Sequence, residues 1–308
     1  MNLRMLNAFR AVVETGSVTR AALQLHITQP AVSRIVADLE GELGFKLFER
    51  VKKRFVLTAE GQAFFTETER LLMSFDGILE AARDIREGRL SRVRIVSMPA
   101  AAHGLLPDAL AVFQKSHPRV SISVDVRRRS EVTRWVAGRQ FDIGVASLPI
   151  NYPGISTRPI ASTFALAAVP NGHPLARKKM ISASDLASER LIGLSADSMI
   201  QDRINQHLTK LGQPANLTID TSSLLAVCHY VAGGLGCGIV DLFTAHAVGT
   251  NHVEFRKLEP ALEIVFGLVF IKDHPPSPQI ESLCEEIERS AVSISQSWES
   301  RNRAPVAS

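Results

Sequence analysis

The chain has 308 residues, which suits two or three domains because soluble domains cluster at about 100–200 residues. Hydrophobic residues make up 45% of it and charged residues 21%, a balance that excludes a disordered or fibrous chain. A formal net charge of +4 is too small over this length to indicate nucleic-acid binding by itself, so the positions of the charges must decide.

Cysteine usage points to a reducing compartment, and hydropathy argues against a membrane span. Cys228, Cys237 and Cys284 form an odd set without CxxC spacing, which argues against a disulfide framework and against structural zinc. We expect three buried thiols, with a redox role for Cys228 or Cys237 as the alternative. No run approaches the roughly 18 apolar residues of a membrane span, and no signal-peptide core follows Met1. The expected location is the cytoplasm, away from membranes.

The first 58 residues predict three short helices followed by a hairpin. Apolar residues at three- and four-residue steps predict a first helix that ends at Gly16. Ser17 can cap a second, alanine-rich helix over residues 18–25. Thr28 can cap a third, with Pro30 in its first turn, where the missing N–H costs nothing. The apolar face of the third helix consists of Val32, Ile35, Val36, Leu39 and Leu43.

The opposite face of the third helix carries groups suited to reading base edges. Arg34 can bind a guanine edge, Gln29 can bind an adenine edge, and the small Ala37 allows close approach to a thymine methyl. Ser33 adds a hydroxyl to this face. An ordinary solvated helix face is the alternative for this helix taken alone.

A basic hairpin follows the third helix. Residues 45–50 and 55–58 predict two short strands, and four of the five residues from Arg50 to Arg54 are basic. Such a hairpin tip next to a recognition helix supplies sequence-independent phosphate contacts. The pattern therefore predicts the wing of a winged helix-turn-helix.

These motifs together resemble the head of LysR-type transcriptional regulators. The motifs that carry the resemblance are Gly16-Ser17, Thr28-Gln29-Pro30-Ala31-Val32-Ser33, Leu39-Glu40, Leu43-Gly44, Leu47-Phe48-Glu49-Arg50 and Leu57-Thr58. The resemblance implies a third helix in the major groove and a wing on the backbone or minor groove. One departure, Val51-Lys52-Lys53, puts the minor-groove contact in question. The candidate DNA contacts are Ser17, Thr19, Thr28, Gln29, Pro30, Ser33, Arg34, Arg50, Lys52, Lys53 and Arg54.

A long connecting helix is expected over residues 59–89. Residues 64 to 85 show alternating steps of four and three, an a/d heptad pattern interrupted by the polar Thr68. This apolar stripe needs a partner, either a second copy of the chain or its own sensor domain. The resemblance favours dimerisation and implies a homodimer or homotetramer. The candidate dimer contacts are Phe64, Leu71, Phe75, Ile78 and Ile85.

After Gly88 the pattern changes to alternating strands and helices, which predicts an α/β domain with parallel sheets. The units repeat, so we expect two lobes and two crossovers, which resembles the periplasmic-binding-protein-like sensor of the same family. The expected boundaries are 1–58 for the winged helix-turn-helix and 59–89 for the linker helix. Lobe I is expected over 90–161 and 268–297, lobe II over 162–267, and a flexible tail over 298–308.

Ligands of open α/β sheets bind beyond the carboxyl ends of the strands. This rule selects the effector candidates Ser97, Met98, Pro99, Ala100, Ser147, Ser195, Asp197, Ser198, Met199, Ser222 and Asp241. A carboxylate held by Ser97 and the start of the Pro99-Ala100 helix, with Asp197 holding an amine, is the expected arrangement. The stretch from Val93 to Pro107 is similar to the subgroup that answers to opines and amino acids. Aromatic acids and other small carboxylates remain alternatives, as do activation and relief of repression.

Enzyme signatures are missing from the sequence. Gly233–Gly238 follows a helix and precedes a strand, the reverse of a phosphate-cradling loop. The histidines lack ligand spacing and no GxSxG motif occurs, so we expect no metal, no cofactor and no catalysis. The alternative is a cytoplasmic solute-binding protein or enzyme built on the two-lobed domain. The expected partners are double-stranded promoter DNA, a small carboxylate effector and, by resemblance, RNA polymerase.

Overall fold

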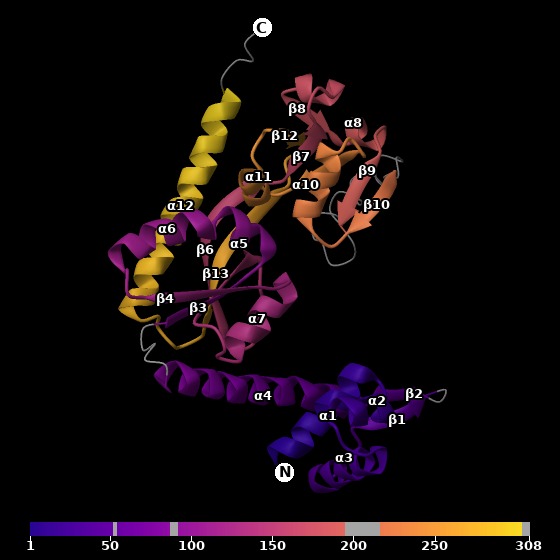
Figure 1. Ribbon diagram of the computed structural model, residues 1–308. Helices are drawn as coiled ribbons and strands as arrows, with labels where there is room; N and C mark the ends of the chain where they lie inside the picture. Colours follow the sequence, from indigo (N-terminus) through magenta and orange to yellow (C-terminus); the bar gives the residue numbers. More distant parts are fainter. Residues whose placement is uncertain (52–53, 87–91, 195–215, 304–308) are drawn as a thin grey trace. The chain divides into compact units, whose positions relative to one another are not determined.

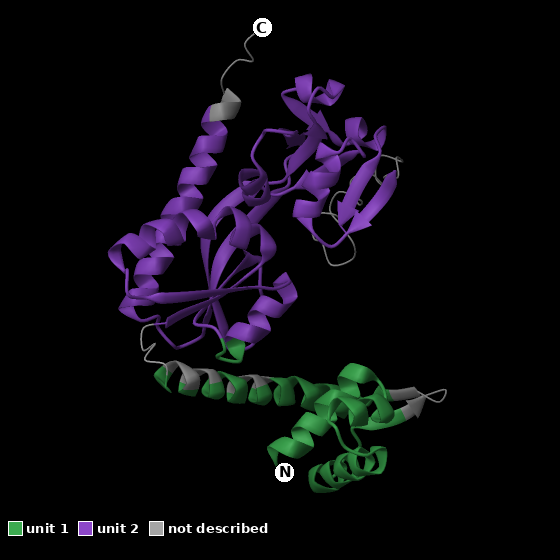
Figure 2. Ribbon diagram, in the orientation of Figure 1, with its two compact units in different colours: residues 1–90, 137–140 green, residues 91–136, 141–308 purple. Residues whose placement is uncertain are grey.

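In the computed structural model, the chain divides into two compact units, shown in Figures 1 and 2. The first contains residues 1–90 and 137–140, and the second contains residues 91–136 and 141–308. The structure describes residues 1–51, 54–86, 92–194 and 216–303. Within these ranges, no helix has the length and apolar character needed to cross a membrane.

The head of the first unit has the predicted order of three helices and a hairpin. Its elements are α1 (Leu3–Thr15), α2 (Val18–Gln24), α3 (Gln29–Leu43), β1 (Phe48–Val51) and β2 (Arg54–Leu57). The strands pair antiparallel, from Phe48↔Leu57 to Val51↔Arg54. Phe9 is fully buried at the centre, with the rings of Phe48, Phe64 and Phe65 within 5.9 Å of its own. The winged helix-turn-helix prediction is confirmed.

Helix α4 (Ala59–Arg86) is the predicted long connecting helix. Its 28 residues correspond to about 42 Å at 1.5 Å per residue. It begins tightly against the wing: a Cβ added to Gly61 would lie 2.2 Å from the carbonyl oxygen of Leu47. The small residue therefore lets the start of the helix pack on the chain that leads into β1.

The first lobe of the second unit is built on a sheet with the strand order β4-β3-β5-β13-β6. Strand β3 runs parallel to β4 and β5, whereas β13 is antiparallel to β5 and β6. The strands are β3 (Arg92–Ser97), β4 (Ser121–Val126), β5 (Ile143–Leu148), β6 (Ile155–Phe164) and β13 (Glu263–Ile271). The helices of this lobe are α5 (Pro99–Gly104), α6 (Leu106–Ser116), α7 (Arg129–Ala137) and α12 (Pro278–Arg303).

The second lobe has the strand order β10-β9-β11-β7-β12-β8. Its strands are β7 (Leu166–Pro170), β8 (Met180–Ser182), β9 (Leu191–Leu194), β10 (Leu217–Thr221), β11 (Cys237–Val240) and β12 (Val253–Glu259). Its helices are η1 (Pro174–Arg177), α8 (Ala183–Ala187), α10 (Leu224–Ala232) and α11 (Leu242–Val248). The turn from α10 to β11 carries positive φ angles at Gly234 and Gly236, as expected of a tight helix-to-strand turn.

Both sheets contain parallel and antiparallel pairs of strands, whereas the sequence pattern predicted parallel sheets. Strand β6 leaves the first lobe and β13 returns to it, and strands that leave and return side by side are necessarily antiparallel. They pair from Ile155↔Ile271 to Phe164↔Glu263, so both lie in the first-lobe sheet along their whole length. The chain therefore crosses after Phe164 and returns before Glu263, a few residues away from the boundaries expected at 161/162 and 267/268.

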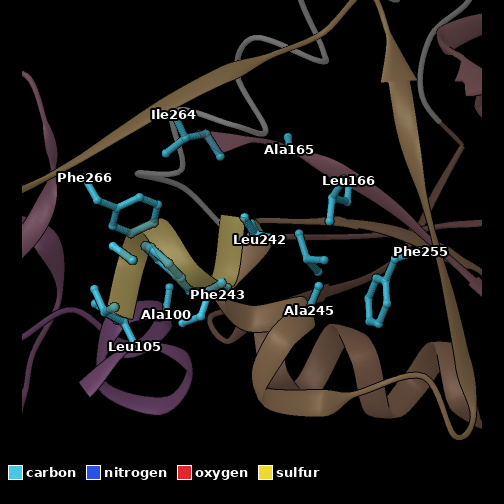
Figure 3. Close-up of a cluster of buried hydrophobic side chains, with 14 of the residues drawn as sticks. Ala100, Leu105, Ala165, Leu166, Leu242, Phe243, Ala245, Phe255, Ile264 and Phe266 are labelled. Carbon is cyan, nitrogen blue, oxygen red and sulfur yellow. The ribbon is translucent and has the colours of Figure 1, made fainter. Parts of the chain in front are cut away.

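One buried cluster runs through both lobes (Figure 3). Phe243 on α11 meets Phe266 on β13 at a centroid distance of 4.6 Å. A Cβ added to Gly104 on α5 would lie 1.8 Å from the Phe243 carbonyl oxygen, so the two helices touch backbone to backbone. His246 Nε2 on α11 also lies 3.0 Å from Asp108 Oδ2 on α6. The lobes therefore share a packed junction.

Candidate functional site

Helix α3 buries one face in the head and exposes the other. The buried residues are Val32, Val36 and Leu39. On the exposed face, the side chain of Arg34 is 86% exposed, and its Nε lies 4.0 Å from Asp38 Oδ2. Gln29 Nε2 donates to Ser33 Oγ over 3.0 Å. These groups are exposed to solvent and weakly held, so they can exchange their present partners for an external ligand.

The other predicted DNA contacts that the structure describes belong to the start of α3, to α2 and to the strands of the wing. Thr28 and Pro30 are exposed at the start of α3, and the Thr28 side chain makes no capping hydrogen bond. Ser17 caps α2 by accepting from Arg20 N over 3.5 Å, and Thr19 is exposed on that helix. Arg50 belongs to β1 and Arg54 to β2, whereas Lys52 and Lys53 lie outside the described residues.

Glu40 ties α3 to the wing, a role that sequence reasoning missed. Its Oε1 accepts hydrogen bonds from the backbone N–H groups of Leu47 and Phe48, at 2.9 and 3.3 Å. Its Oε2 lies 2.6 Å from Lys46 Nζ. Burial alone raises the pKa of Glu40, but these hydrogen bonds outweigh it and hold the pKa below its ordinary value. The carboxylate is thus ionised where it fixes the wing relative to the recognition helix.

Helix α4 carries exposed apolar side chains at the predicted seam positions. Leu71, Phe75, Ile78 and Ile85 are 46%, 38%, 63% and 65% exposed. Phe64 differs, because its ring packs against Phe9 and Phe45 in the head. The stripe available to a partner therefore begins after the first turns of the helix, and Phe64 acts as a core residue in the described structure.

The predicted effector residues of the first lobe meet at the carboxyl edge of its sheet. Ser97 is fully buried, and its hydroxyl donates to Met98 O over 3.0 Å. Ser147 N donates to Met98 Sδ over 3.1 Å. Pro99 and the buried Ala100 start α5, which is only six residues long. The Ser97 hydroxyl is thus already engaged and Pro99 offers no N–H, so the N–H groups of Ala100 and Ala101 are the donors that remain at this short helix start.

Arginines that follow β4 complete this edge, and they were not among the residues predicted from the sequence. Arg127 N donates to Ser97 O over 3.0 Å, which fixes the loop beside β3. Arg129 Nε donates to Ser147 O over 2.9 Å, and its Nη2 donates to Pro149 O. The signal was present in the sequence, since the run Arg127-Arg128-Arg129 directly follows a strand that the same carboxyl-end rule covers.

The second-lobe candidates are less well placed. Ser195, Asp197, Ser198 and Met199 lie outside the described residues. Ser222 is exposed just after β10, and the next residue, Ser223, caps α10. Asp241 is buried and caps α11, because its carboxylate accepts from Thr244 N and Thr244 Oγ1 at 2.9 Å each. Burial raises the pKa of Asp241 despite these bonds. Asp241 therefore serves the fold of the second lobe.

Among the described residues, His173, Glu189 and Cys237 form a group of metal-ligating type, with ligand atoms within 4.8 Å of one another. His173 Nδ1 accepts from Leu175 N over 3.3 Å, so the neutral ring carries its proton on Nε2. That nitrogen faces Glu189 Oε2 at 3.6 Å. His173 thus caps η1 through Nδ1 and faces Glu189 through Nε2, both within the second lobe.

Comparison with known proteins agrees with this architecture. Residues 3–62 match the family described as bacterial regulatory helix-turn-helix protein, lysR family, and residues 86–291 match the LysR substrate binding domain. The chain is 35% identical over 273 residues to the regulatory protein NocR of Agrobacterium fabrum, covering 89% of this chain and 91% of that protein. It is 34% identical over 243 residues to the octopine catabolism/uptake operon regulatory protein OccR of Rhizobium meliloti, covering 78% and 80%.

Solved structures agree at the level of the fold. The crystal structure of CbnR, a LysR family transcriptional regulator, superposes with a TM-score of 0.63 at 22% identity, covering 94% of this chain and 99% of that one. Full-length CbnR complexed with its target DNA gives a TM-score of 0.62 at 23% identity, covering 94% and 100%. With both family matches and the two-unit architecture in agreement, the chain belongs to the LysR family of bacterial transcriptional regulators.

Proposed function

We propose that this regulator reads promoter DNA with the exposed face of α3 and changes transcription when a small carboxylate binds its sensor domain. The observation that carries the proposal is the pairing of an open, hydrogen-bonding face on α3 with a wing whose tip is rich in lysine and arginine. Arg34 and Gln29 have the donors that guanine and adenine edges accept in the major groove. The basic wing contributes phosphate contacts that set affinity and register.

The effector class follows from whole-chain similarity to two regulators. OccR is by its name a regulator of octopine catabolism and uptake, and NocR is similar to the chain at 35% identity. We infer that the effector is an opine or a related amino-acid derivative. The relevant chemistry is a secondary or primary amine next to one or more carboxylates, which a sensor can distinguish from aromatic acids by its charged ends.

The proposed assembly is a homodimer or homotetramer that acts on promoter DNA in the cytoplasm, together with RNA polymerase. The exposed residues Leu71, Phe75, Ile78 and Ile85 of α4 support a second copy of the chain as the partner, because a stripe of this kind is costly to leave in water. Pairing of two heads would place two α3 helices on successive half-sites of a palindromic operator.

The experiment is a gel-shift titration of the full chain on the divergent promoter region beside its gene, at moderate salt and with competitor DNA. Arg34→Ala is expected to cost about 1–3 kcal/mol on the preferred site and to flatten sequence preference. Arg4→Ala is the matched control, since Arg4 is also exposed in the head but lies on α1. A parent chain without any sequence preference would favour a solute-binding protein or an enzyme built on the two-lobed domain.

A further inference from the structure

We propose that Arg129 is the carboxylate anchor of the effector site, at the carboxyl edge of the first-lobe sheet. The inference rests on the proposed function, because it names the residue by which the sensor recognises its effector. It moves the anchor away from the α5 start, where Ser97 is already engaged.

The Arg129 side chain lies at the carboxyl edge of the first-lobe sheet. Arg129 follows β4, yet its guanidinium bonds to the carbonyls of Ser147 and Pro149 at the end of β5. The sheet order is β4-β3-β5, and neighbouring strands lie about 4.8 Å apart. The backbone after β4 reaches the end of β3, where Arg127 N donates to Ser97 O, and from the start of α7 the Arg129 side chain reaches the end of β5. This is the edge at which open α/β sheets bind their ligands.

Hydrogen bonds hold the Arg129 guanidinium in place, but no carboxylate among the described residues pairs with its positive charge. Four other partly buried arginines, namely Arg94, Arg127, Arg158 and Arg256, each form an ion pair with a carboxylate. Arg129, also partly buried, forms no ion pair within the described residues; its partners are two main-chain carbonyls. Burial lowers the pKa of Arg129, which reflects the cost of holding this cation away from water. A bound anion would offset that cost.

The guanidinium keeps donors in reserve. Of its five N–H groups, one is directed at Ser147 O and one at Pro149 O, which leaves three for a ligand. Because two carbonyls fix the plane of the group, the remaining donors form a rigid fork of the kind that binds a carboxylate through both oxygens. This preorganisation lowers the entropy cost of binding.

The neighbouring charges favour a carboxylate over a doubly charged phosphate. Arg127 is committed, since its Nη2 lies 3.0 Å from Asp125 Oδ2 and its guanidinium carbon lies 5.1 Å from the centre of the Trp135 ring. Glu131 adds a negative charge in the first turn of α7, where it accepts from Arg128 N over 3.1 Å. One partly buried guanidinium without a carboxylate partner among the described residues matches a singly charged ligand group, such as the carboxylate end of an opine.

The test is isothermal titration calorimetry of the full chain with octopine as the probe. Arg129→Gln is expected to weaken binding at least about tenfold, since it removes a charge-assisted, two-point contact. Arg129→Lys, which keeps the charge but not the fork, should lie between Arg129→Gln and the parent. The matched control is Arg134→Gln, because Arg134 is exposed on the same helix; it should bind within about twofold of the parent.

The possible outcomes distinguish an error in the anchor residue from an error in the proposed effector class. If Arg129→Gln binds octopine as the parent does, the anchor is wrong while the octopine response stands. If the parent itself gives no binding heat, both the opine assignment and the anchor for it are wrong, whereas promoter recognition is decided by the gel shift. Thermal unfolding without octopine shows whether each variant is folded. If Arg129→Gln proves unstable, Arg129→Lys decides the question, and an affinity for octopine equal to that of the parent would overturn the two-point contact.

Discussion

Glu40 Oε1 accepts a 2.9 Å hydrogen bond from Leu47 N, and this contact joins the recognition helix to the start of the wing. Two backbone donors and the Lys46 ammonium converge on a side chain that is only 10% exposed. The placement of α3 relative to the wing thus depends on a carboxylate that itself faces the protein. Loss of the Glu40 carboxylate should therefore weaken the proposed base contacts of α3 and the proposed phosphate contacts of the wing together.

Glu40→Ala is expected to destabilise the head by about 1–3 kcal/mol, because two partly buried N–H groups lose their acceptor. Since the folded pKa of Glu40 is lowered, its contribution is present above the ordinary value of 4.5 and disappears as the pH falls through the folded pKa. Hydrogen exchange of the α3 amides between pH 7 and pH 4 measures this. Asp38→Ala, at an exposed site on the same helix, is the control. Equal protection in both variants would show that Glu40 is not the tie.

Gly104→Ala is expected to destabilise the sensor domain by about 3 kcal/mol. The added Cβ would lie 1.8 Å from the carbonyl oxygen of Phe243, and a backbone atom cannot move aside without separating α5 from α11. Thermal unfolding of the full chain is the measurement. Gly41→Ala makes the same change in α3 with no atom within 4 Å, and should instead stabilise by about 0.5–1 kcal/mol. Parental stability of Gly104→Ala would mean that the lobes are not in close contact at this point.

Phe75→Asp should dissociate the chain into smaller species and abolish tight operator binding. In a paired α4 the new carboxylate would be buried without a partner, a cost of several kcal/mol. Light scattering of the eluted protein reports the mass. Gln62→Asp places the same side chain at an exposed position near the start of α4 and should leave the mass unchanged. A Phe75→Asp variant with parental mass would indicate that the stripe packs elsewhere.

The three thiols should not react in the folded protein. Cys228, Cys237 and Cys284 are buried, and burial raises the pKa of each to about 12, so almost no thiolate exists at pH 8. Ellman's reagent is expected to give no rapid colour before denaturant is added and three equivalents afterwards. Rapid native labelling of Cys228 or Cys237 would restore the redox alternative.

Local pattern was sufficient for the head. The period of Val32, Val36 and Leu39 predicted which side of α3 is buried, because a 3.6-residue repeat depends only on helix geometry. The exposed positions Gln29, Ser33 and Arg34 followed from the same count. The family resemblance rests on motifs of the same head, such as residues 28–33 and 47–50, and both family matches confirm it.

Strands with weak alternation escaped sequence reasoning. Residues 155–164 contain Pro159 and several polar side chains, yet they form β6, because pairing with β13 supplies the hydrogen bonds and a partner for nearly every position. Because β6 was not predicted, the predicted crossover positions between the lobes also differ by a few residues from the observed ones. The apolar run of residues 264–271 predicts a strand, but pairing between segments a hundred residues apart leaves no local signal of which strands pair.

The sequence by itself determined the family and the exposed face of α3, and it identified the carboxyl edge of the sensor sheet as the candidate ligand edge, since each follows from local spacing or from strand polarity. Only the tertiary structure decided which groups at that edge are committed. Ser97 was selected because it ends a strand, but its hydroxyl is used by Met98 O. Arg129 was passed over, although its guanidinium spans to the end of β5 and forms no ion pair with the described residues. Whether a polar group already has a hydrogen-bond or ion-pair partner depends on neighbours that the strand order brings together. That order is fixed by packing across the whole domain.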